Sequence, residues 1–189
     1  MSDARAFREV TRLRDGTPVT IRAVRADDRE RVARAFAALD RDTVYTRFFA
    51  YRKALDEAEL ARLAAMDFVG EAMLVATVGA GDDETIVAGA RYVVDPTGDA
   101  RTAEIAFTVE EDFQGRGLAG RMLDRLAALA RTNGIARLEA IVLDTNRPML
   151  RVFERSGLPA KTSRRDGDVV VTLDLGAAGG RDGGPAREP

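Results

Sequence analysis

The chain has 189 residues, of which 46% are hydrophobic and 32% are charged, a composition typical of one globular domain. It contains no cysteine and no histidine, so disulfides, thiol nucleophiles, Ser-His-Asp hydrolases and histidine-ligated zinc enzymes are excluded, and we expect no metal site. The N-terminus is too charged for a signal peptide and no apolar run approaches the ~18 residues of a membrane span. We therefore expect a cytoplasmic protein that does not contact a membrane.

The first half of the chain predicts one strand, two helices and two further strands. Residues 1–16 are polar and we expect them to be flexible. A strand at 19–22 follows a Gly- and Pro-containing turn, and Asp27 or Asp28 can cap a helix that runs to about residue 39. Asp56 caps a second helix. Between these helices lies an aromatic-rich connection at 41–50, and after them come apolar strands at 72–78 and 85–94, which we expect to pair antiparallel.

The second half predicts a strand, a glycine-rich turn and a helix in immediate succession. Residues 102–109 mix apolar, aromatic and β-branched side chains and predict a buried strand. An apolar repeat predicts a helix over 118–132, which ends at Asn133-Gly134. A strand at 138–143 follows through this helix, so we expect it to be parallel to 102–109.

The last part of the chain predicts one short helix and one strand. Asn146 caps the helix, which Gly157 ends, and alternation of valine and leucine predicts a strand at 168–175. Residues 176–189 are rich in Gly, Ala, Pro and charge, and we expect them to be disordered.

The turn at 114–120 has the features of a phosphate-binding loop. Gly115 and Gly117 permit left-handed backbone angles and a close approach to a ligand, and the following helix start presents free N–H groups. Arg116 adds a cation. The letters Gly115-x-Gly117-x-x-Gly120 also fit the dinucleotide fingerprint, but five residues separate the strand from the first glycine, and too few strand–helix units follow.

The same stretch resembles the Q/R-x-x-G-x-G/A pyrophosphate loop of the Gcn5-related N-acetyltransferases (GNAT). The matching residues are Gln114, Gly115, Arg116, Gly117, Leu118, Ala119 and Gly120. A second match follows downstream, where Asn146, Met149, Phe153, Gly157 and Leu158 have the spacing of the family's N-x-x-A-x-x-x-Y-x-x-x-G-F pattern. The resemblance implies acetyl-CoA as co-substrate, bound by the loop together with Thr108, Val109, Asn146 and Phe153.

The predicted element order is also that of the GNAT fold. It is a mixed α/β sheet in the order β-α-α-β-β-β-α-β-α-β, in which the central parallel strands splay apart around the pantetheine arm of coenzyme A. Further strings upstream, such as Ile21-Arg22-x-x-Arg25-x-x-Asp28, are similar to the acetyltransferase domain of bacterial Pat-type protein lysine acetyltransferases. This likeness covers residues 17–175, which we expect to form the catalytic domain.

The resemblance places the general base at Glu104. A lysine ammonium has a solution pKa of ~10.4, so a base must remove its proton, and without histidine a carboxylate is the best candidate. Glu110, Glu111 and Glu139 remain alternative bases. Glu104 is alternatively a surface acid at the edge of the strand with no catalytic role. In the family, a bulge leaves backbone N–H groups near Thr108 and Val109 free to bind the carbonyl oxygen.

The general acid departs from the family's pattern. Phe153 stands where a tyrosine often protonates the leaving thiolate, so water or one of Tyr45, Tyr51 and Tyr92 must supply the proton if a donor is needed. A thiol with a pKa of ~8.5 leaves tolerably without full protonation.

These features predict an acetyl-CoA-dependent N-acetyltransferase whose acceptor is an amine, with protein lysine preferred. Residues 54–113 carry three basic and 14 acidic side chains, which favours a cationic acceptor next to the acyl donor, although solvated surface acids explain the same composition. The alternatives are a small-molecule amine acceptor and a catalytically silent acyl-CoA-binding sensor. The net charge of −2 and the scattered basic residues argue against a nucleic-acid partner.

Overall fold

The computed structural model describes residues 4–40, 43, 54–99 and 101–176. Most of the predicted connection at 41–50, together with Tyr45 and Tyr51, lies outside the described residues. So does the predicted tail, apart from Gly176.

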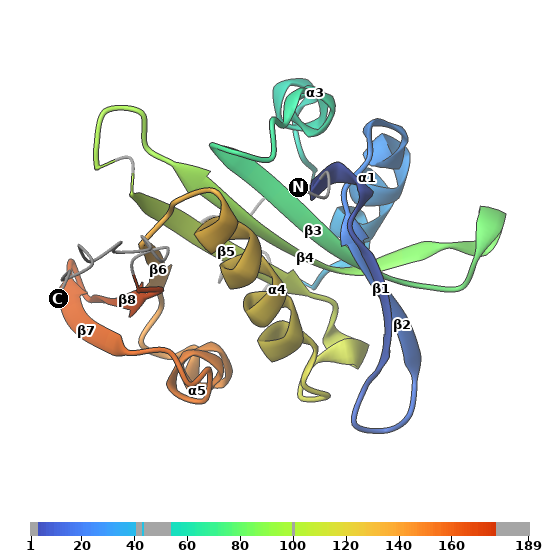
Figure 1. The fold of residues 1–189 in the computed structure, drawn as a ribbon. Helices are drawn as coiled ribbons and strands as arrows, with labels where there is room; N and C mark the ends of the chain where they lie inside the picture. The colour runs from blue at the N-terminus through green and yellow to red at the C-terminus, as the bar shows by residue number, and fades with distance from the viewer. Residues whose placement is uncertain (1–3, 41–42, 44–53, 100, 177–189) are drawn as a thin grey trace, which may run out of the picture.

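One mixed sheet of eight strands forms the centre of the described chain, in the order β1-β2-β3-β4-β5-β6-β8-β7 (Figure 1). Neighbouring strands pair antiparallel except β5 and β6, which are parallel as predicted. The mixed α/β class is therefore confirmed. The strands are β1 (Arg8–Arg12), β2 (Pro18–Ala23), β3 (Glu71–Val78), β4 (Thr85–Val94), β5 (Thr102–Val109), β6 (Arg137–Val142), β7 (Ala160–Arg165) and β8 (Asp168–Asp174).

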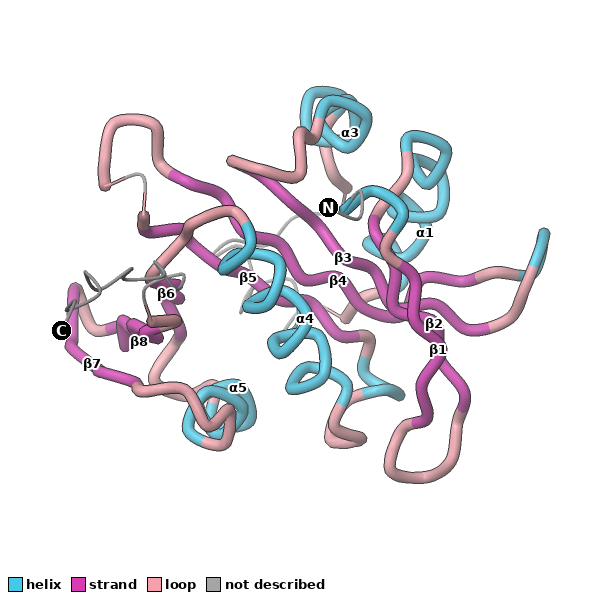
Figure 2. Tube along the Cα trace, viewed as in Figure 1, coloured by secondary structure: helices cyan, strands magenta, loops and turns pink. Residues whose placement is uncertain are grey.

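Helices cover both faces of the sheet (Figure 2). On one face Tyr92 of β4 is buried and its hydroxyl accepts a hydrogen bond from Asn133, at the end of α4. Its neighbour Arg91 points to the opposite face, into a cavity lined by α1 and α3, because successive strand residues alternate. The α-helices described are α1 (Arg29–Ala38), α3 (Glu57–Ala65), α4 (Leu118–Thr132) and α5 (Arg147–Glu154).

The helix starts and ends follow local chemistry with one exception. Asp56 caps α3 as predicted, because its carboxylate accepts the N–H of Glu59 at 2.8 Å while the Glu59 side chain accepts the N–H of Asp56. Asp28 stands at the N-cap position of α1, but its side chain makes no capping bond. It is buried against Arg22 instead, so the expected cap is wrong there.

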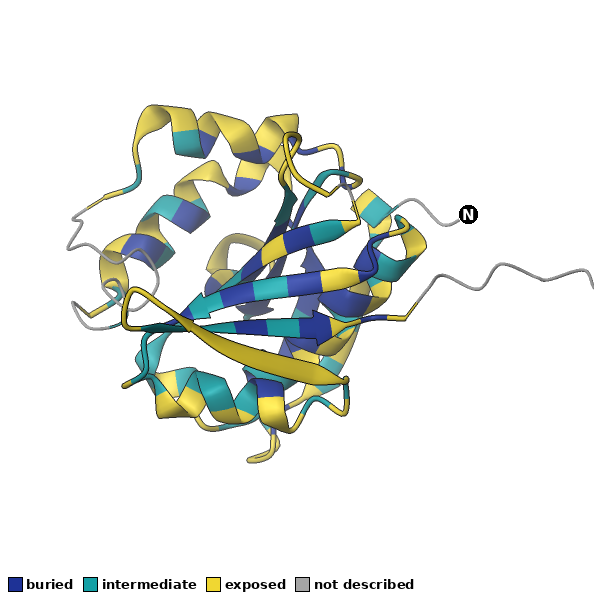
Figure 3. Ribbon diagram, turned by 90° about the vertical axis from the view of Figure 1, so that its left-hand side faces the viewer, coloured by how far each residue is buried: buried dark blue, intermediate teal, exposed yellow. Residues whose placement is uncertain are grey.

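Two strands were not predicted from the sequence. Residues 8–12 form β1, which pairs with β2 from Arg8 opposite Arg22 to Arg12 opposite Pro18. The expectation of a flexible N-terminus is therefore wrong for these residues, since backbone pairing does not require apolar side chains. Every residue of the edge strand β7 is exposed, and Figure 3 shows it as an unbroken yellow strand.

The central parallel pair separates after a short stretch. β5 pairs with β6 only from Thr102 to Glu104, opposite Arg137 to Glu139. Both strands continue beyond these pairs, so the far half of β5 has no strand partner on its β6 side. The gap between the separated ends of β5 and β6 is where the candidate active site lies.

Candidate active site

A groove of about 630 Å³ lies where β5 and β6 separate. A ligand site for a small molecule or cofactor has a volume of roughly 300–1,000 Å³, so the groove is large enough for one. Of the predicted coenzyme-binding residues, nine line it. They are Thr108, Val109, Gln114, Gly115, Gly117, Leu118, Ala119, Gly120 and Asn146.

The glycine loop has the backbone geometry expected of an anion site. Gly115 and Gly117 adopt φ angles of 71° and 88°, in the left-handed region that only glycine enters cheaply. Gly117 is the N-cap residue of α4, and no side chain caps this helix. The first-turn N–H groups and the positive end of the helix dipole therefore meet the groove without a competing acceptor.

Two predicted binding residues do not line the groove. The guanidinium of Arg116 lies over the ring of Phe113 and pairs with Asp15, with Nη1 and Oδ2 2.7 Å apart. Phe153 is buried and its ring packs edge-on against Phe107, with centroids 6.1 Å apart. Phe107 lines the groove, so Phe153 supports its wall.

Gln114 and Asn146 stabilise the two ends of the groove wall. The Gln114 amide donates to the carbonyl of Val109 at 3.0 Å, which ties the loop back to β5. The Asn146 carbonyl oxygen accepts the N–H of Met149 at 3.2 Å and caps α5 as predicted.

The backbone of β5 presents polar groups to the groove, but not the pair that was expected. Glu110 donates its N–H to Val87, and in an antiparallel ladder such positions alternate with outward-facing ones. The backbone N–H and C=O groups of Thr108, which is opposite Gly89, therefore point toward β4. The backbone N–H and C=O groups of Phe107 and Val109 point toward the open side, where β6 has separated. The β4–β5 register is regular over the paired residues 88–94 and 103–109, so the expected bulge is absent from this pairing.

Glu104 occupies the last paired position of β5 and β6, directly opposite Glu139. Its side chain is exposed and does not line the groove. Alternation along β5 places it on the same face as Ala106 and Thr108, which is the face of α1 and α3.

The described tyrosine is poorly placed to act as the general acid. Tyr92 is fully buried, donates to the carbonyl of Val69 at 3.1 Å and accepts from Asn133 at 2.7 Å. Burial raises the pKa of its hydroxyl to about 12, and it does not line the groove.

A second cavity, of about 180 Å³, lies on the opposite face of the sheet between α1, α3 and strands β3 to β5. Thr108 lines both this cavity and the groove. Thr108 therefore lies between the two spaces, at the end of β5.

Three cations of the groove were not predicted from the sequence. Arg14 reaches it from the turn between β1 and β2, and Arg151 and Arg155 reach it from α5 and the residue that follows it. Arg14 is 103 residues before Gly117, yet a Cβ on Gly117 would lie 3.2 Å from its Nε. Only the docking of β1 brings them together, and no local pattern signals it.

None of the described helices is both long and apolar enough to cross a membrane.

Comparison with known proteins agrees with this geometry. Residues 34–158 match the Acetyltransferase (GNAT) family. The chain is 34% identical over 160 residues to the acetyltransferase Pat of Mycolicibacterium smegmatis, covering 85% of this chain and 46% of that protein. It thus spans about half the length of this relative. It is also 31% identical over 162 residues to an acetyltransferase of Pseudomonas aeruginosa, covering 86% of each chain.

Solved structures show the same architecture. The GNAT domain of S. lividans PAT superposes with a TM-score of 0.80 at 34% identity, over 88% of this chain and 96% of that one. The Salmonella typhimurium protein yncA, solved with its cofactor acetyl-CoA, has the same fold at 20% identity and a TM-score of 0.67, over 87% of this chain and 98% of its own. The chain belongs to the GNAT family of acetyltransferases.

Proposed function

We propose that this chain transfers the acetyl group of acetyl-CoA to an amine, and that the acceptor is the lysine side chain of a protein. The observation that carries the proposal is the groove at the splayed end of β5, where outward-facing backbone groups meet an uncapped helix start and two left-handed glycines. The similarity to Pat-type enzymes supports the lysine acceptor.

The loop and the groove cations bind the phosphate-containing half of the co-substrate in this proposal. Free N–H groups of the first turn of α4 donate to the pyrophosphate, and Arg14, Arg151 and Arg155 neutralise phosphate charge. Phe107 and Val109 turn their backbone groups toward the pantetheine arm and the thioester. The carbonyl oxygen of the acetyl group accepts from one of these N–H groups, which stabilises the oxyanion as it forms.

Glu104 is the proposed general base. One ammonium proton first passes through water to Glu104. The neutral amine nitrogen then attacks the thioester carbonyl, the carbon–sulfur bond breaks as the thiolate of coenzyme A departs, and the nitrogen releases its second proton to water. Phe153 has no proton to donate, so the thiolate leaves without a tyrosine donor at that position. A cytoplasmic location is part of the proposal and agrees with the absence of cysteine.

The test is incubation of the protein with acetyl-CoA and a panel of lysine-bearing proteins and small amines. We expect free thiol to appear and the mass of a protein acceptor to rise by one acetyl group. Acetylation of small amines alone would replace the acceptor class. Tight acetyl-CoA binding without acetylation of any amine would establish a silent sensor instead.

A further inference from the structure

The second cavity has apolar walls and one acidic end. Its apolar lining comes from α1, α3 and the residues that flank them, and from β3 and β4 across the cavity; Val32, Phe36, Leu63, Met73, Ile86 and Ala88 are examples. Such walls suit an unbranched alkyl chain, since they offer dispersion contact and exclude water.

The charged groups at one end of the cavity are paired by charge, although Oε1 of Glu71 and Nε of Arg91 are buried there without a hydrogen-bond partner. Arg91 pairs with Glu71 at 2.6 Å, Arg62 lies 3.4 Å from the same carboxylate, and Glu59 accepts the N–H of Asp56. This end carries its own counter-charges.

Glu110 lines the other end and is differently placed. Its Oε2 is buried and has no hydrogen-bond partner. Burial raises the pKa of this carboxyl, the backbone N–H of Asp112 opposes this by donating to the carboxylate, and the nearby charges of Asp112 and Glu111 raise the pKa further. A buried carboxylate oxygen without a donor costs free energy, and a cationic ligand would remove that cost.

The register of the sheet separates the two ends. Arg91 pairs opposite Ala106 of β5, and Glu110 bonds Val87 four residues further along β4. At about 3.3 Å per residue this separates the arginine from the glutamate by about 13 Å along the strand. A cation in the cavity therefore meets paired charges of both signs at the arginine end and the carboxylate of Glu110 at the other end.

Glu110 also lies close to the coenzyme groove. Thr108 lines both spaces, and Glu110 follows it on the same face of β5, about 7 Å further along. An ammonium group held near Glu110 is thus close to Thr108, the residue that the cavity and the groove share.

This inference rests on the proposed function. We propose that the apolar cavity holds the alkyl chain of a primary-amine acceptor and that Glu110 receives its ammonium group, which makes Glu110 a positioning residue that selects cationic acceptors. The chemical class of the occupant is an unbranched aliphatic primary amine, such as a lysine side chain.

The test compares two probes that differ only at the chain end. Nα-acetyl-lysine methylamide carries the ammonium, and Nα-acetyl-norleucine methylamide has the same alkyl path without it. Calorimetric titration in the presence of coenzyme A should show at least tenfold tighter binding of the lysine probe to the wild type. In Glu110→Gln this preference should disappear while the norleucine affinity stays within twofold.

Kinetics give a second readout. With acetyl-CoA, Glu110→Gln should raise the KM for the lysine probe at least tenfold and change kcat less, and Glu110→Asp should be intermediate. Glu30→Gln removes the same charge from the exposed side of α1 and should match the wild type. Melting temperatures of all variants check that they fold.

The outcomes separate this inference from the proposed function. Absence of acetyl transfer from the wild type to any amine would overturn the proposed function. Transfer with an unchanged KM in Glu110→Gln, equal loss of both probes, or no binding of either probe to the wild type would overturn only the role of Glu110 and the cavity.

Discussion

Glu104 lies four positions before Thr108 on β5, and this spacing determines how a proton can travel from an acceptor amine near Thr108 to Glu104. The distance along the strand is about 13 Å, whereas direct proton transfer needs a contact of roughly 2.6–3.2 Å. Glu110, which the further proposal places next to the ammonium group, is about 20 Å from Glu104 along the strand, so a chain of water molecules must carry the proton to Glu104. Glu139, its neighbour on β6, is the matched carboxylate at the same level of the sheet.

Glu104→Gln should lower kcat by roughly 10²–10⁴, the usual contribution of a general base. Acetyl-CoA affinity should stay within a few-fold, because Glu104 does not line the groove. The defect should shrink as the pH rises toward the amine's own pKa, where the nucleophile is already neutral. Rate profiles against pH measure this, and normal turnover in Glu104→Gln with loss in Glu139→Gln would move the base to β6.

The two glycines that flank α4 allow the loop to be tested without confusing strain with binding. Gly117 and Gly134 both have φ near 80°, at 88° and 78°, so an alanine costs roughly 1–2 kcal/mol of stability at either position. Only at Gly117 does the new Cβ face the groove and Arg14. Gly117→Ala should weaken acetyl-CoA binding at least tenfold in a thermal-shift titration, and Gly134→Ala should not; equal effects would show that strain alone acts.

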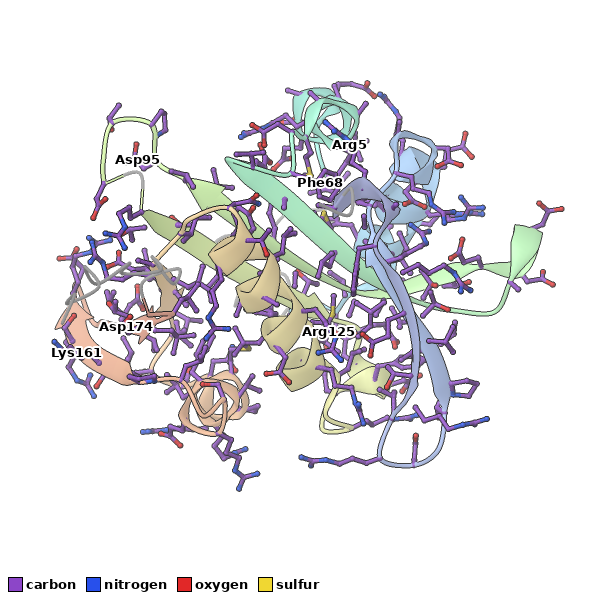
Figure 4. The ribbon with its side chains drawn as sticks, in the orientation of Figure 1. Arg5, Phe68, Asp95, Arg125, Lys161 and Asp174 are labelled. Carbon is purple, nitrogen blue, oxygen red and sulfur yellow. The ribbon has the colours of Figure 1, made fainter. Side chains whose placement is uncertain are left out.

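At the scale of elements, β1 fastens the coenzyme loop to the sheet. Glu9 binds Arg125 of α4 through two bonds of 2.6 and 2.9 Å, Arg121 donates to Thr11, and Arg116 pairs with Asp15. Figure 4 shows Arg125 between α4 and the β1–β2 hairpin. The hairpin therefore lies along α4 and ends at the glycine loop.

Glu9→Gln should lower stability only slightly. The side chains of the pair are 42% and 32% exposed, and such pairs contribute about 0.2–1 kcal/mol. For a chain of this size the expected fall in Tm is about 1–4 °C, and it should shrink in high salt because ions screen the pair. A fall well beyond this range in a thermal melt would mean that β1 contributes cooperatively to the fold.

At the scale of the whole molecule, elements with apolar periodicity were predicted well from the sequence. The helix at 118–132 agrees with α4 because Leu118, Met122 and Leu126 repeat toward the core, and the parallel pairing of 102–109 followed from the helical connection. β1 and β7 escaped prediction because most of their side chains are polar and exposed or half-buried, and their partners lie in other strands or, for β1, also in α4. Pairing partners distant in sequence leave no local pattern.

In the candidate site too, residues with a local sequence pattern were predicted, and residues whose position depends on distant partners were not. The loop from Gln114 to Gly120 has its own signature, since left-handed turns require glycine. Arg116 was expected to face the ligand, but Asp15 of the hairpin holds it elsewhere. Glu110 was one of three alternative acids. Glu110 and Glu111 are both half-buried, but Oε2 of Glu110 is buried without a hydrogen-bond partner, whereas Glu111 accepts the N–H of Asp40.

One buried ion cluster ties the start of the chain to the sheet. Arg22 of β2 binds both carboxylate oxygens of Asp28, at 2.6 and 2.8 Å, and also Glu84 at 3.0 Å. Arg22 and Asp28 are 1% and 0% exposed. Burial opposes ionisation of Asp28, but the bonds from Arg22 and from the N–H of Arg25 outweigh it and hold its pKa below the usual value. The bond from Arg22 likewise lowers the pKa of Glu84.

Because both folded-state pKa values are lowered, the unfolded chain binds protons first as the pH falls. The stability that Asp28 and Glu84 contribute is therefore complete above their unfolded pKa values of about 4 and is lost as the pH falls through the lower, folded values. Asp28→Asn leaves Arg22 buried without its main counter-charge, so at pH 7 it should cost about 3–5 kcal/mol. Urea unfolding from pH 7 to pH 3 should show this deficit shrinking with acidity, since the wild type loses the same charge by protonation. Asp82→Asn, on the exposed turn beside Glu84, is the control and should follow the wild type at every pH. A deficit that stays constant with pH would mean that Asp28 acts through packing rather than through its charge.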